Sequence, residues 1–167
     1  MTLNYSKLSN EYSVKRLTEK DIESVLDLYN SNPDYFKFFP PMPSIESIKL
    51  DMSILPPGCE IHNKYYLGYW DEKELVGVLD IILRYPDVET VYIGLFMIDK
   101  RFQSDGRGSK IIMELIDFLT LDYKFIQLAL MKENKAAQAF WEKNGFKIIG
   151  NEVDLEHGNA VKMKLTL

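Results

Sequence analysis

The chain carries Gln103-Ser104-Asp105-Gly106-Arg107-Gly108 between a strongly apolar run at residues 91–98 and an amphipathic helical pattern at residues 109–121. The order of elements is therefore strand, glycine turn, helix. A chain that makes such a turn exposes backbone N–H groups at a helix N-terminus, where the helix dipole favours negative charge. The junction predicts a turn that can hold a phosphate or a pyrophosphate.

The residues around this turn alternate between strands and helices. The pattern predicts a strand at 90–98, a helix at 106–121, a strand at 125–130, a helix at 136–143, and strands at 146–150 and 160–165. Asn144-Gly145 is a good C-cap signature for the second of these helices. This alternation predicts a parallel or mixed sheet with covering helices.

The first half predicts more strands and two helices. The expected elements are a strand at 12–17, helices at 21–30 and 45–54, and strands at 64–70 and 75–85. Residues 35–42 hold four aromatic side chains beside prolines, and Pro41 and Pro43 argue against a helix there. The four strands up to residue 98 indicate an antiparallel portion. The predicted fold is α/β: a single domain over residues 1–167, with a mixed central sheet of about seven strands and about four flanking helices.

Composition and charge exclude several classes of protein. The 167-residue chain has a formal net charge of −5 and is 46% hydrophobic, which is typical of a folded globular domain. The acidic balance argues against nucleic-acid and membrane-surface partners. No apolar run approaches the roughly 20 residues of a membrane span, and the N-terminus lacks a signal-peptide core. Cys59 stands alone, and His62 and His157 give no metal-binding spacing, so we expect a cytoplasmic domain without a metal.

Two familiar phosphate-binding motifs do not fit the glycine turn. A P-loop requires Gly-Lys-Ser/Thr, whereas Gly108 is followed by Ser109 and then Lys110. A dinucleotide fingerprint requires a third glycine where the chain has Ile111. What remains is Gln-x-x-Gly-x-Gly opening a helix after a long strand. Two glycines by themselves are often only a turn, so this motif needs a second one beside it.

A second motif follows the turn at residues 134–146. Its residues are Asn134, Ala137, Phe140, Lys143, Gly145 and Phe146. With this pair of motifs the chain resembles the GNAT superfamily of N-acetyltransferases, which carries V-x-P-x-x-[RQ]-x-x-G-x-[GA] followed by N-x-x-A-x-x-[LF]-Y-x-k-x-G-F. Ile98, Gln103, Gly106 and Gly108 fall on the first pattern, with Lys100 where proline is common. The match is strongest over 90–150, and the resemblance implies a mostly antiparallel sheet with the acceptor site in residues 1–89.

The resemblance implies acetyl-CoA as a co-substrate. Its pyrophosphate would be bound by the main chain of the turn: Gln103, Ser104, Asp105, Gly106, Arg107, Gly108 and Ser109. The main chain of Phe96, Met97 and Ile98 would pair with the pantetheine arm, and Gly94 would belong to a bulge that splays this strand from its neighbour. Asn134, Phe140 and Trp141 would also contact the cofactor, although Asn134 is equally well explained as a helix N-cap.

The implied reaction is direct acetyl transfer to a primary amine of a small molecule or a peptide. A neutral amine attacks the thioester carbonyl, which a main-chain N–H near Met97 or Ile98 polarises, and coenzyme A leaves as a thiol. Trp141 stands where many relatives have a tyrosine that donates a proton to the thiolate, and an indole N–H is no acid in this range. A thiol pKa of roughly 8.5 lets the thiolate leave without that help. The other explanation of Trp141 is packing in the core or in a pocket wall. The alternative function of the chain is a non-catalytic acyl-CoA-binding or regulatory module.

Asp80 and Glu89 are the candidates for the base that deprotonates the amine. Asp80 interrupts an apolar strand, where burial of a carboxylate costs free energy and raises its pKa. Glu89 lies in the loop before the strand at 90–98. The aromatic segment 35–42 would form one wall of the acceptor site, or else a satellite core. The expected partners are acetyl-CoA and the amine, and a homodimer is an option because dimers are common in the family.

Overall fold

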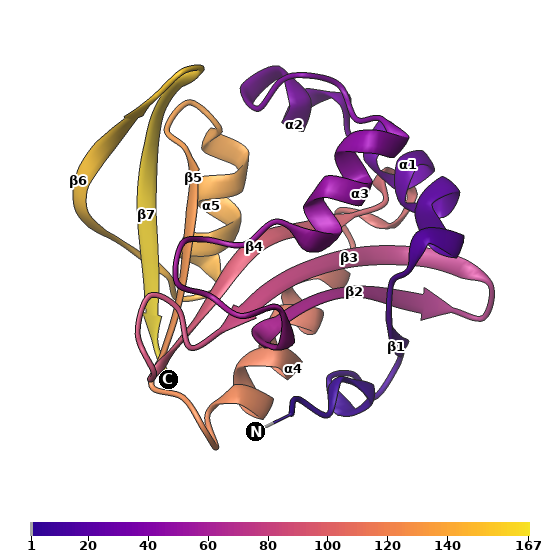
Figure 1. Cartoon of the computed structure of the whole chain (residues 1–167), viewed down its shortest axis with the longest axis horizontal. Coiled ribbons are helices and arrows are strands. Elements are labelled where there is room, and N and C mark those ends of the chain that lie inside the picture. The colour runs from indigo at the N-terminus through magenta and orange to yellow at the C-terminus, as the bar shows by residue number, and fades with distance from the viewer. Residues whose placement is uncertain (1) are drawn as a thin grey trace.

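One sheet of seven strands organises the chain (Figure 1). The computed structural model describes residues 2–167. The strands are β1 (Ser13–Arg16), β2 (Lys64–Asp71), β3 (Glu74–Leu83), β4 (Thr90–Ile98), β5 (Phe125–Met131), β6 (Lys147–Leu155) and β7 (Gly158–Thr166). They lie in the order β1-β2-β3-β4-β5-β7-β6. All neighbours are antiparallel except β4 and β5, which are parallel, so the predicted mixed, mostly antiparallel sheet is confirmed.

Helices cover both faces of this sheet. They are α1 (Ile22–Asn30), α2 (Pro33–Phe38), α3 (Ile45–Ser53), α4 (Arg107–Leu119) and α5 (Lys135–Lys143), with 3-10 turns at η1 (Tyr5–Lys7), η2 (Glu19–Asp21), η3 (Ile61–Asn63) and η4 (Lys100–Phe102). Helices α1 and α3 bury Val25 and Ile48 in one apolar cluster with strand residues such as Val78. Helices α4 and α5 belong to a second cluster with the intervening strand residues, because side chains alternate between the faces of a strand.

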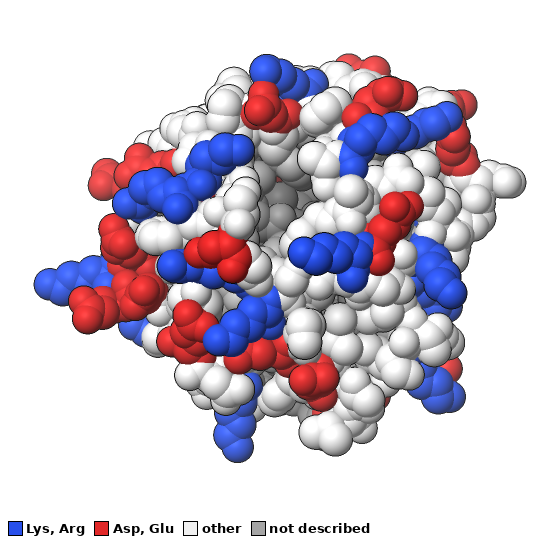
Figure 2. All heavy atoms as spheres, turned by 180° about the vertical axis from the view of Figure 1, so that it is seen from behind, with Lys and Arg blue, Asp and Glu red and all other residues white. Residues whose placement is uncertain are grey.

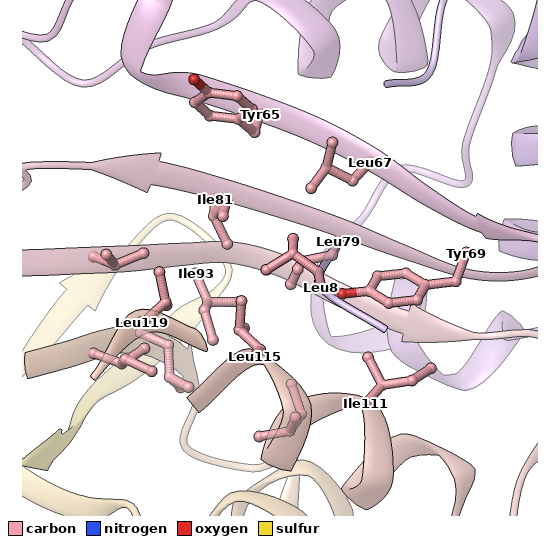
Figure 3. Close-up of a cluster of buried hydrophobic side chains, with 14 of the residues drawn as sticks. Leu8, Tyr65, Leu67, Tyr69, Leu79, Ile81, Ile93, Ile111, Leu115 and Leu119 are labelled. Carbon is pink, nitrogen blue, oxygen red and sulfur yellow. The ribbon is translucent and has the colours of Figure 1, made fainter. Parts of the chain in front are cut away.

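The second cluster is the larger of the two and is shown in part in Figure 3. Helix α4 repeats apolar residues at a spacing of three to four, and Ile111 and Leu115 from this stripe point toward the strands. They meet Leu79 and Ile81 of β3 and Ile93 of β4, all of which are buried. Full burial of each such side chain contributes about 1.5–3 kcal/mol. The apolar face predicted for the helix after the glycine turn is thus the face that fixes α4 on the sheet.

Two predicted elements need correction. Residues 35–38 were expected to be non-helical, but they belong to α2, since Pro33 occupies the first turn of that helix, where a missing N–H costs nothing. The other prolines act only after the helix has ended at Phe38. Strand β6 extends to Leu155 rather than stopping at 150, because its pairing with β7 resumes at Val153 after an irregularity.

Strands β4 and β5 separate halfway along their length. Residues 90–93 of β4 pair with 125–128 of β5, and the pairing ends there. The β3–β4 register shifts at the same point: Asp80 pairs with Leu95 and Ile81 with Ile93, which leaves Gly94 as the extra residue of a bulge. Beyond it the two strands diverge, as Figure 1 shows. The prediction that Gly94 belongs to a bulge that splays these strands is confirmed.

Candidate functional site

A cavity of about 680 Å³ lies at the divergence of β4 and β5. One wall comes from α1, α2 and α3, including Tyr29, Tyr35 and Asp51. The opposite wall comes from β5, α5 and the β6–β7 hairpin, including Asn134 and Trp141. The face of the molecule in Figure 2 is hollowed near its centre, and the atoms around the hollow are mostly uncharged. The split sheet therefore opens a largely apolar space that reaches from the first half of the chain to the second.

The glycine turn stands at the start of α4. Gly106 has a φ of 87°, a left-handed value that a residue with a side chain adopts only at a cost. A Cβ on Gly106 would meet no atom within 4 Å, so the space beside it is open, whereas a Cβ on Gly108 would come within 3.3 Å of Phe140. No side chain caps the helix at Gly106. The N–H of Arg107 already donates to Asp105 Oδ1 at 3.2 Å. The open space therefore adjoins the other first-turn N–H groups, which have no intrahelical partners and can bind an anion.

Three cations around this turn are already paired with carboxylates. Arg107 Nε lies 2.6 Å from Asp105 Oδ2, and Lys110 pairs with Glu11. Arg101 donates from Nη2 to Asp99 Oδ2 at 3.1 Å and from Nη1 to Glu74 Oε1 at 3.2 Å. The positive potential offered by the turn therefore comes mainly from the main chain.

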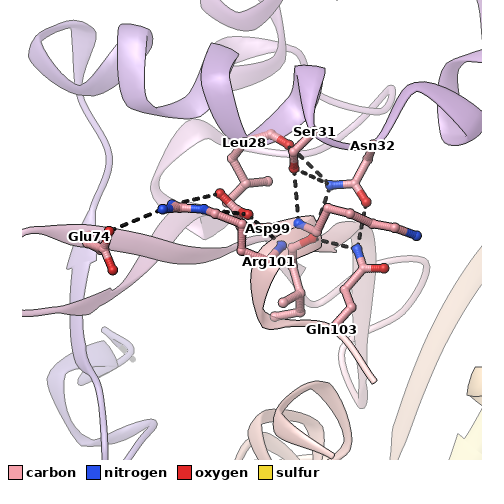
Figure 4. A network of polar contacts seen from close by, with 9 residues as sticks. Leu28, Ser31, Asn32, Glu74, Asp99, Arg101 and Gln103 are labelled. Atoms are coloured by element: carbon pink, nitrogen blue, oxygen red, sulfur yellow. Dashed lines mark hydrogen bonds and ion pairs between the residues drawn. The ribbon is translucent and has the colours of Figure 1, made fainter. Parts of the chain in front are cut away.

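Gln103 fixes the turn against the end of α1, as Figure 4 shows. Its Nε2 donates to Asn32 Oδ1 at 2.6 Å and to the carbonyl oxygen of Ile98 at 2.8 Å. Asn32 Nδ2 donates to the same Ile98 oxygen at 3.0 Å, and Ser31 Oγ accepts from the N–H of Lys100 at 3.1 Å. The sequence singled out Gln103 for its main chain, whereas its side chain ties the turn to the first half of the molecule.

The α5 residues named by the second motif form an aromatic and polar wall. Asn134 lines the cavity, and its Oδ1 accepts from the N–H of Ala137 at 3.1 Å, which makes it the N-cap of α5. Trp141 also lines the cavity, with 7% of its surface exposed. Its ring centroid lies 6.0 Å from that of Phe96 and 5.0 Å from that of Phe140. Trp141 is therefore a wall and core residue, as the packing explanation predicted.

Asp80 lies beneath the bulge, in a central strand rather than at an edge. A Cβ on Gly94 would come within 2.8 Å of Asp80 Oδ2, so the absence of a side chain at Gly94 makes room for the carboxylate. Lys64 Nζ donates to Asp80 Oδ1 at 2.9 Å and to Oδ2 at 2.8 Å. Burial raises the pKa of Asp80, and the Lys64 charge and hydrogen bond oppose that rise. Both side chains are nearly buried and both line the cavity.

Lys64 was not singled out by the sequence. It is the first residue of β2, and it precedes a run of aromatic and aliphatic residues in which nothing marks its side chain as buried. Only the strand pairing indicates the contact. Tyr66 lies opposite Asp80 in the β2–β3 ladder, and Lys64 lies two residues before Tyr66 on the same strand. Register therefore reveals this ion pair, whereas residue spacing along the chain does not.

Asp51 is the second cavity carboxylate that the sequence missed. It lies in the last turn of α3 and is half-buried. Burial, with a smaller contribution from the Asp80 charge, raises the pKa of Asp51 to about 6, and the Lys64 charge acts against the rise. On a helix with a mixed sequence a single aspartate is typical of a solvated face, so no local pattern separates it from its exposed neighbours.

Glu89 is not brought to the cavity. Its carboxylate pairs with Lys124 at the surface, and its carbonyl oxygen accepts from the N–H of Lys124 at 2.9 Å. These contacts hold the loop before β4 against the start of β5, which is a structural role. Of the two carboxylates named from the sequence, Asp80 alone lines the cavity.

The aromatic segment of the first half forms the outer wall. Tyr35, Phe36, Phe38 and Phe39 line the cavity, and Tyr35 and Phe36 also pack against the smaller apolar cluster. Tyr29 and Tyr66 join their hydroxyl groups by a hydrogen bond next to this wall. This segment is thus both a wall of the cavity and part of an apolar cluster, and its role in binding the acceptor stays a prediction.

Residues 2–167 show neither a metal-binding cluster nor a membrane-spanning helix. These residues contain no group of three or more His, Cys, Asp or Glu side chains placed to hold a metal ion. None of their helices is long and apolar enough to cross a membrane.

Known proteins resemble the chain in sequence and in fold. A family model described as the acetyltransferase (GNAT) family matches residues 22–146. The spermine/spermidine N(1)-acetyltransferase of Bacillus subtilis (strain 168) is 29% identical over 160 residues, covering 91% of this chain and 97% of that protein. An acetyltransferase from Thermus thermophilus has a TM-score of 0.76 at 20% identity, covering 92% of this chain and 96% of its own. Spermidine N-acetyltransferase from Vibrio cholerae, solved with CoA and spermine, has a TM-score of 0.68 at 17% identity, covering 95% and 96%.

Proposed function

The chain belongs to the acetyltransferase (GNAT) family, and we propose that it transfers the acetyl group of acetyl-CoA to a primary amine of a linear polyamine. The observation that carries the choice of acceptor is the cavity, which combines aromatic walls with two carboxylates, Asp51 and Asp80. The relative from Bacillus subtilis is named for spermine and spermidine. Aromatic rings suit a methylene chain and its ammonium groups, and carboxylates suit the ammonium charges.

The residues of the turn fit the co-substrate. Open space beside Gly106 and the N–H groups of Gly108 and Ser109, which lie in the first turn of α4, suit the pyrophosphate of acetyl-CoA. Residues 103–109 would hold that group, and Asn134, Phe140 and Trp141 would border the pantetheine arm. The Ile98 carbonyl already accepts from Asn32 and Gln103. The main chain of Phe96 and Met97 would therefore pair with the pantetheine arm, along the part of β4 that no longer pairs with β5.

Asp80 is the residue best placed to receive a proton from the acceptor. An alkylammonium group has a pKa near 10, so the amine must lose a proton before or during attack. Burial raises the pKa of Asp80 and makes it a stronger base than an exposed aspartate, while the Lys64 charge and hydrogen bond act against that rise. Its place beneath Gly94 puts it where the cavity passes between β4 and β5. Trp141 donates no proton in this scheme, and the coenzyme A thiolate leaves unaided.

Thiol release with a panel of amines tests this function. Purified protein with acetyl-CoA should release coenzyme A when spermidine, spermine or 1,4-diaminobutane is added. It should release much less with an amino acid or a peptide amine. Acetyl-CoA alone should raise the melting temperature, since it binds the folded state. Stabilisation without turnover on any amine would favour the non-catalytic acyl-CoA-binding module instead. No stabilisation at millimolar acetyl-CoA would contradict both functions.

The cytoplasmic location and the homodimer expected from the sequence stay predictions. Size-exclusion chromatography with light scattering measures the second of them directly.

A further inference from the structure

We propose that Asp51 selects acceptors that carry a second ammonium group, by pairing with that group while the first amine reacts beside Asp80. This inference rests on the proposed function and assigns the two cavity carboxylates separate roles. Asp80 belongs to the reacting end of the acceptor, and Asp51 belongs to its distal end.

The charges inside the cavity do not balance without a ligand. Lys64 Nζ donates to both carboxylate oxygens of Asp80, at 2.9 and 2.8 Å, so these two residues neutralise each other. Asp51 makes no side-chain hydrogen bond or ion pair with any of residues 2–167. Two carboxylates thus face one neighbouring ammonium group, and the charge left over is on Asp51. Even partial burial of a charge without a partner costs free energy, and a cationic ligand reduces that cost.

The two carboxylates enter the cavity from different layers of the fold. Asp80 belongs to β3 and lies next to the Gly94 bulge, whereas Asp51 belongs to the last turn of α3, which covers the sheet. They are close enough for the charge of Asp80 to act on Asp51. An acceptor that reaches from the split between β4 and β5 toward α3 passes Asp80 first and Asp51 second. A linear diamine has one amine for each position.

The side chains around Asp51 favour an organic cation over a bare metal ion. Tyr29 of α1, Tyr35 of α2 and Tyr66 of β2 all lie close enough for the Asp51 charge to act on their hydroxyl groups. Burial raises the pKa of Tyr35 to about 12, so this hydroxyl stays neutral under working conditions. Aromatic rings around one carboxylate suit an alkylammonium group and its methylene chain. They offer no further anionic oxygen for a divalent ion, which takes six or more oxygen ligands.

Selection by Asp51 depends on pH in a defined direction. The charged and titratable groups that face it are Asp80, Lys64 and the three tyrosines named above, and the tyrosines stay neutral. With the pKa of Asp51 raised to about 6, the carboxylate is ionised at pH 8 and protonated at pH 5. The preference for a diamine should therefore weaken as the pH falls through about 6. A bound ammonium group lowers this pKa, so the weakening begins at a lower pH when the diamine is saturating.

The test compares 1,4-diaminobutane with n-butylamine, which has the same four-carbon chain and lacks the second ammonium. The wild type should prefer the diamine in kcat/KM by about 10- to 100-fold, the effect of one charge-assisted hydrogen bond. Asp51→Asn should bring this ratio close to one by raising KM for the diamine, with the monoamine unchanged. Asp51→Glu should keep part of the preference. Asp34→Asn, at an exposed aspartate of the adjacent α2, is the matched control and should behave as wild type.

Two results would overturn the role of Asp51. One is an unchanged ratio in Asp51→Asn, and the other is an equal loss for both amines, which a structural or proton-transfer role would produce. If the wild type acetylates none of these amines, the proposed acceptor class is wrong. The role of Asp51 is then tested by the binding of each amine, measured as a shift in melting temperature. It stands if 1,4-diaminobutane raises the melting temperature of the wild type more than n-butylamine does and loses that advantage in Asp51→Asn. It fails if both amines act equally on both proteins.

Discussion

The two ends of the cavity are built in different ways. The end at the glycine turn is made by the main chain of one continuous segment, from the end of β4 into α4, and its pattern is visible in the sequence. The acceptor end is made by side chains from α1, α2, α3, β2 and β3 that meet only in the folded sheet. A site built from backbone groups constrains glycines at fixed spacing, whereas a site built from converging side chains leaves no such signature. In the proposed function, the first end binds the co-substrate and the second selects the acceptor.

The largest effect should separate the two carboxylates named from the sequence. Asp80→Asn should lower kcat by about 10²- to 10⁴-fold, the usual contribution of a general base, with little change in acetyl-CoA affinity. Glu89→Gln should retain wild-type kcat, because Glu89 pairs with Lys124 outside the cavity. Steady-state thiol release measures both. Since Asp80→Asn leaves Lys64 buried without its partner, a melting curve must show that the variant is folded at the assay temperature.

A change at the glycine turn should act on the other end alone. Gly106→Val forces a β-branched residue into a left-handed conformation and fills the open space beside the turn. We expect acetyl-CoA to bind about 10- to 100-fold more weakly, while KM for the amine stays near the wild-type value. Isothermal titration with coenzyme A measures the first effect, and amine kinetics at saturating acetyl-CoA measure the second. A large rise in the amine KM would show that the two ends are not independent.

A smaller effect should appear in stability rather than in activity. The pKa of Asp51 is raised to about 6 in the folded protein, against about 3.9 in an unfolded chain. The free energy of unfolding of the wild type therefore falls as the pH rises from about 4 through about 6. Over this range Asp51 ionises readily in the unfolded chain, whereas its partly buried site in the folded protein disfavours the charge. Asp51→Asn removes that charge and should be about 1–3 kcal/mol more stable than wild type at pH 8. Below pH 4 the difference should vanish, as urea unfolding at the two pH values will show.

The smallest effect is expected at Trp141. If the thiolate leaves without an acid, Trp141→Tyr should change kcat by less than about threefold, because the new hydroxyl supplies a step that is not limiting. The variant should lose about 1–3 kcal/mol of stability, since a smaller ring leaves space among Phe96, Phe140 and Phe146. A rise in kcat of tenfold or more would instead show that proton donation limits the wild type.

The sequence was informative where local chemistry determines the structure. Strand β4 was predicted to the residue, and the bulge at Gly94 was implied by the family resemblance. Asp80 was found because a carboxylate in an apolar strand requires a reason. Lys64 and Asp51 were missed, since a lysine at a strand end and an aspartate on a helix are ordinary at the surface. Only the register of β2 on β3 and the position of α3 over the sheet reveal that both are directed inward.

The most direct measurement is a crystal structure with coenzyme A and spermidine bound together. This arrangement of the site predicts the pyrophosphate on the main chain of residues 103–109 and two spermidine nitrogens within about 3.2 Å of carboxylate oxygens. One of these nitrogens should lie on Asp80 near the coenzyme A sulfur, and the other on Asp51. A spermidine bound outside the cavity, with Asp80 contacting only Lys64 and Asp51 left without a cation, would contradict it.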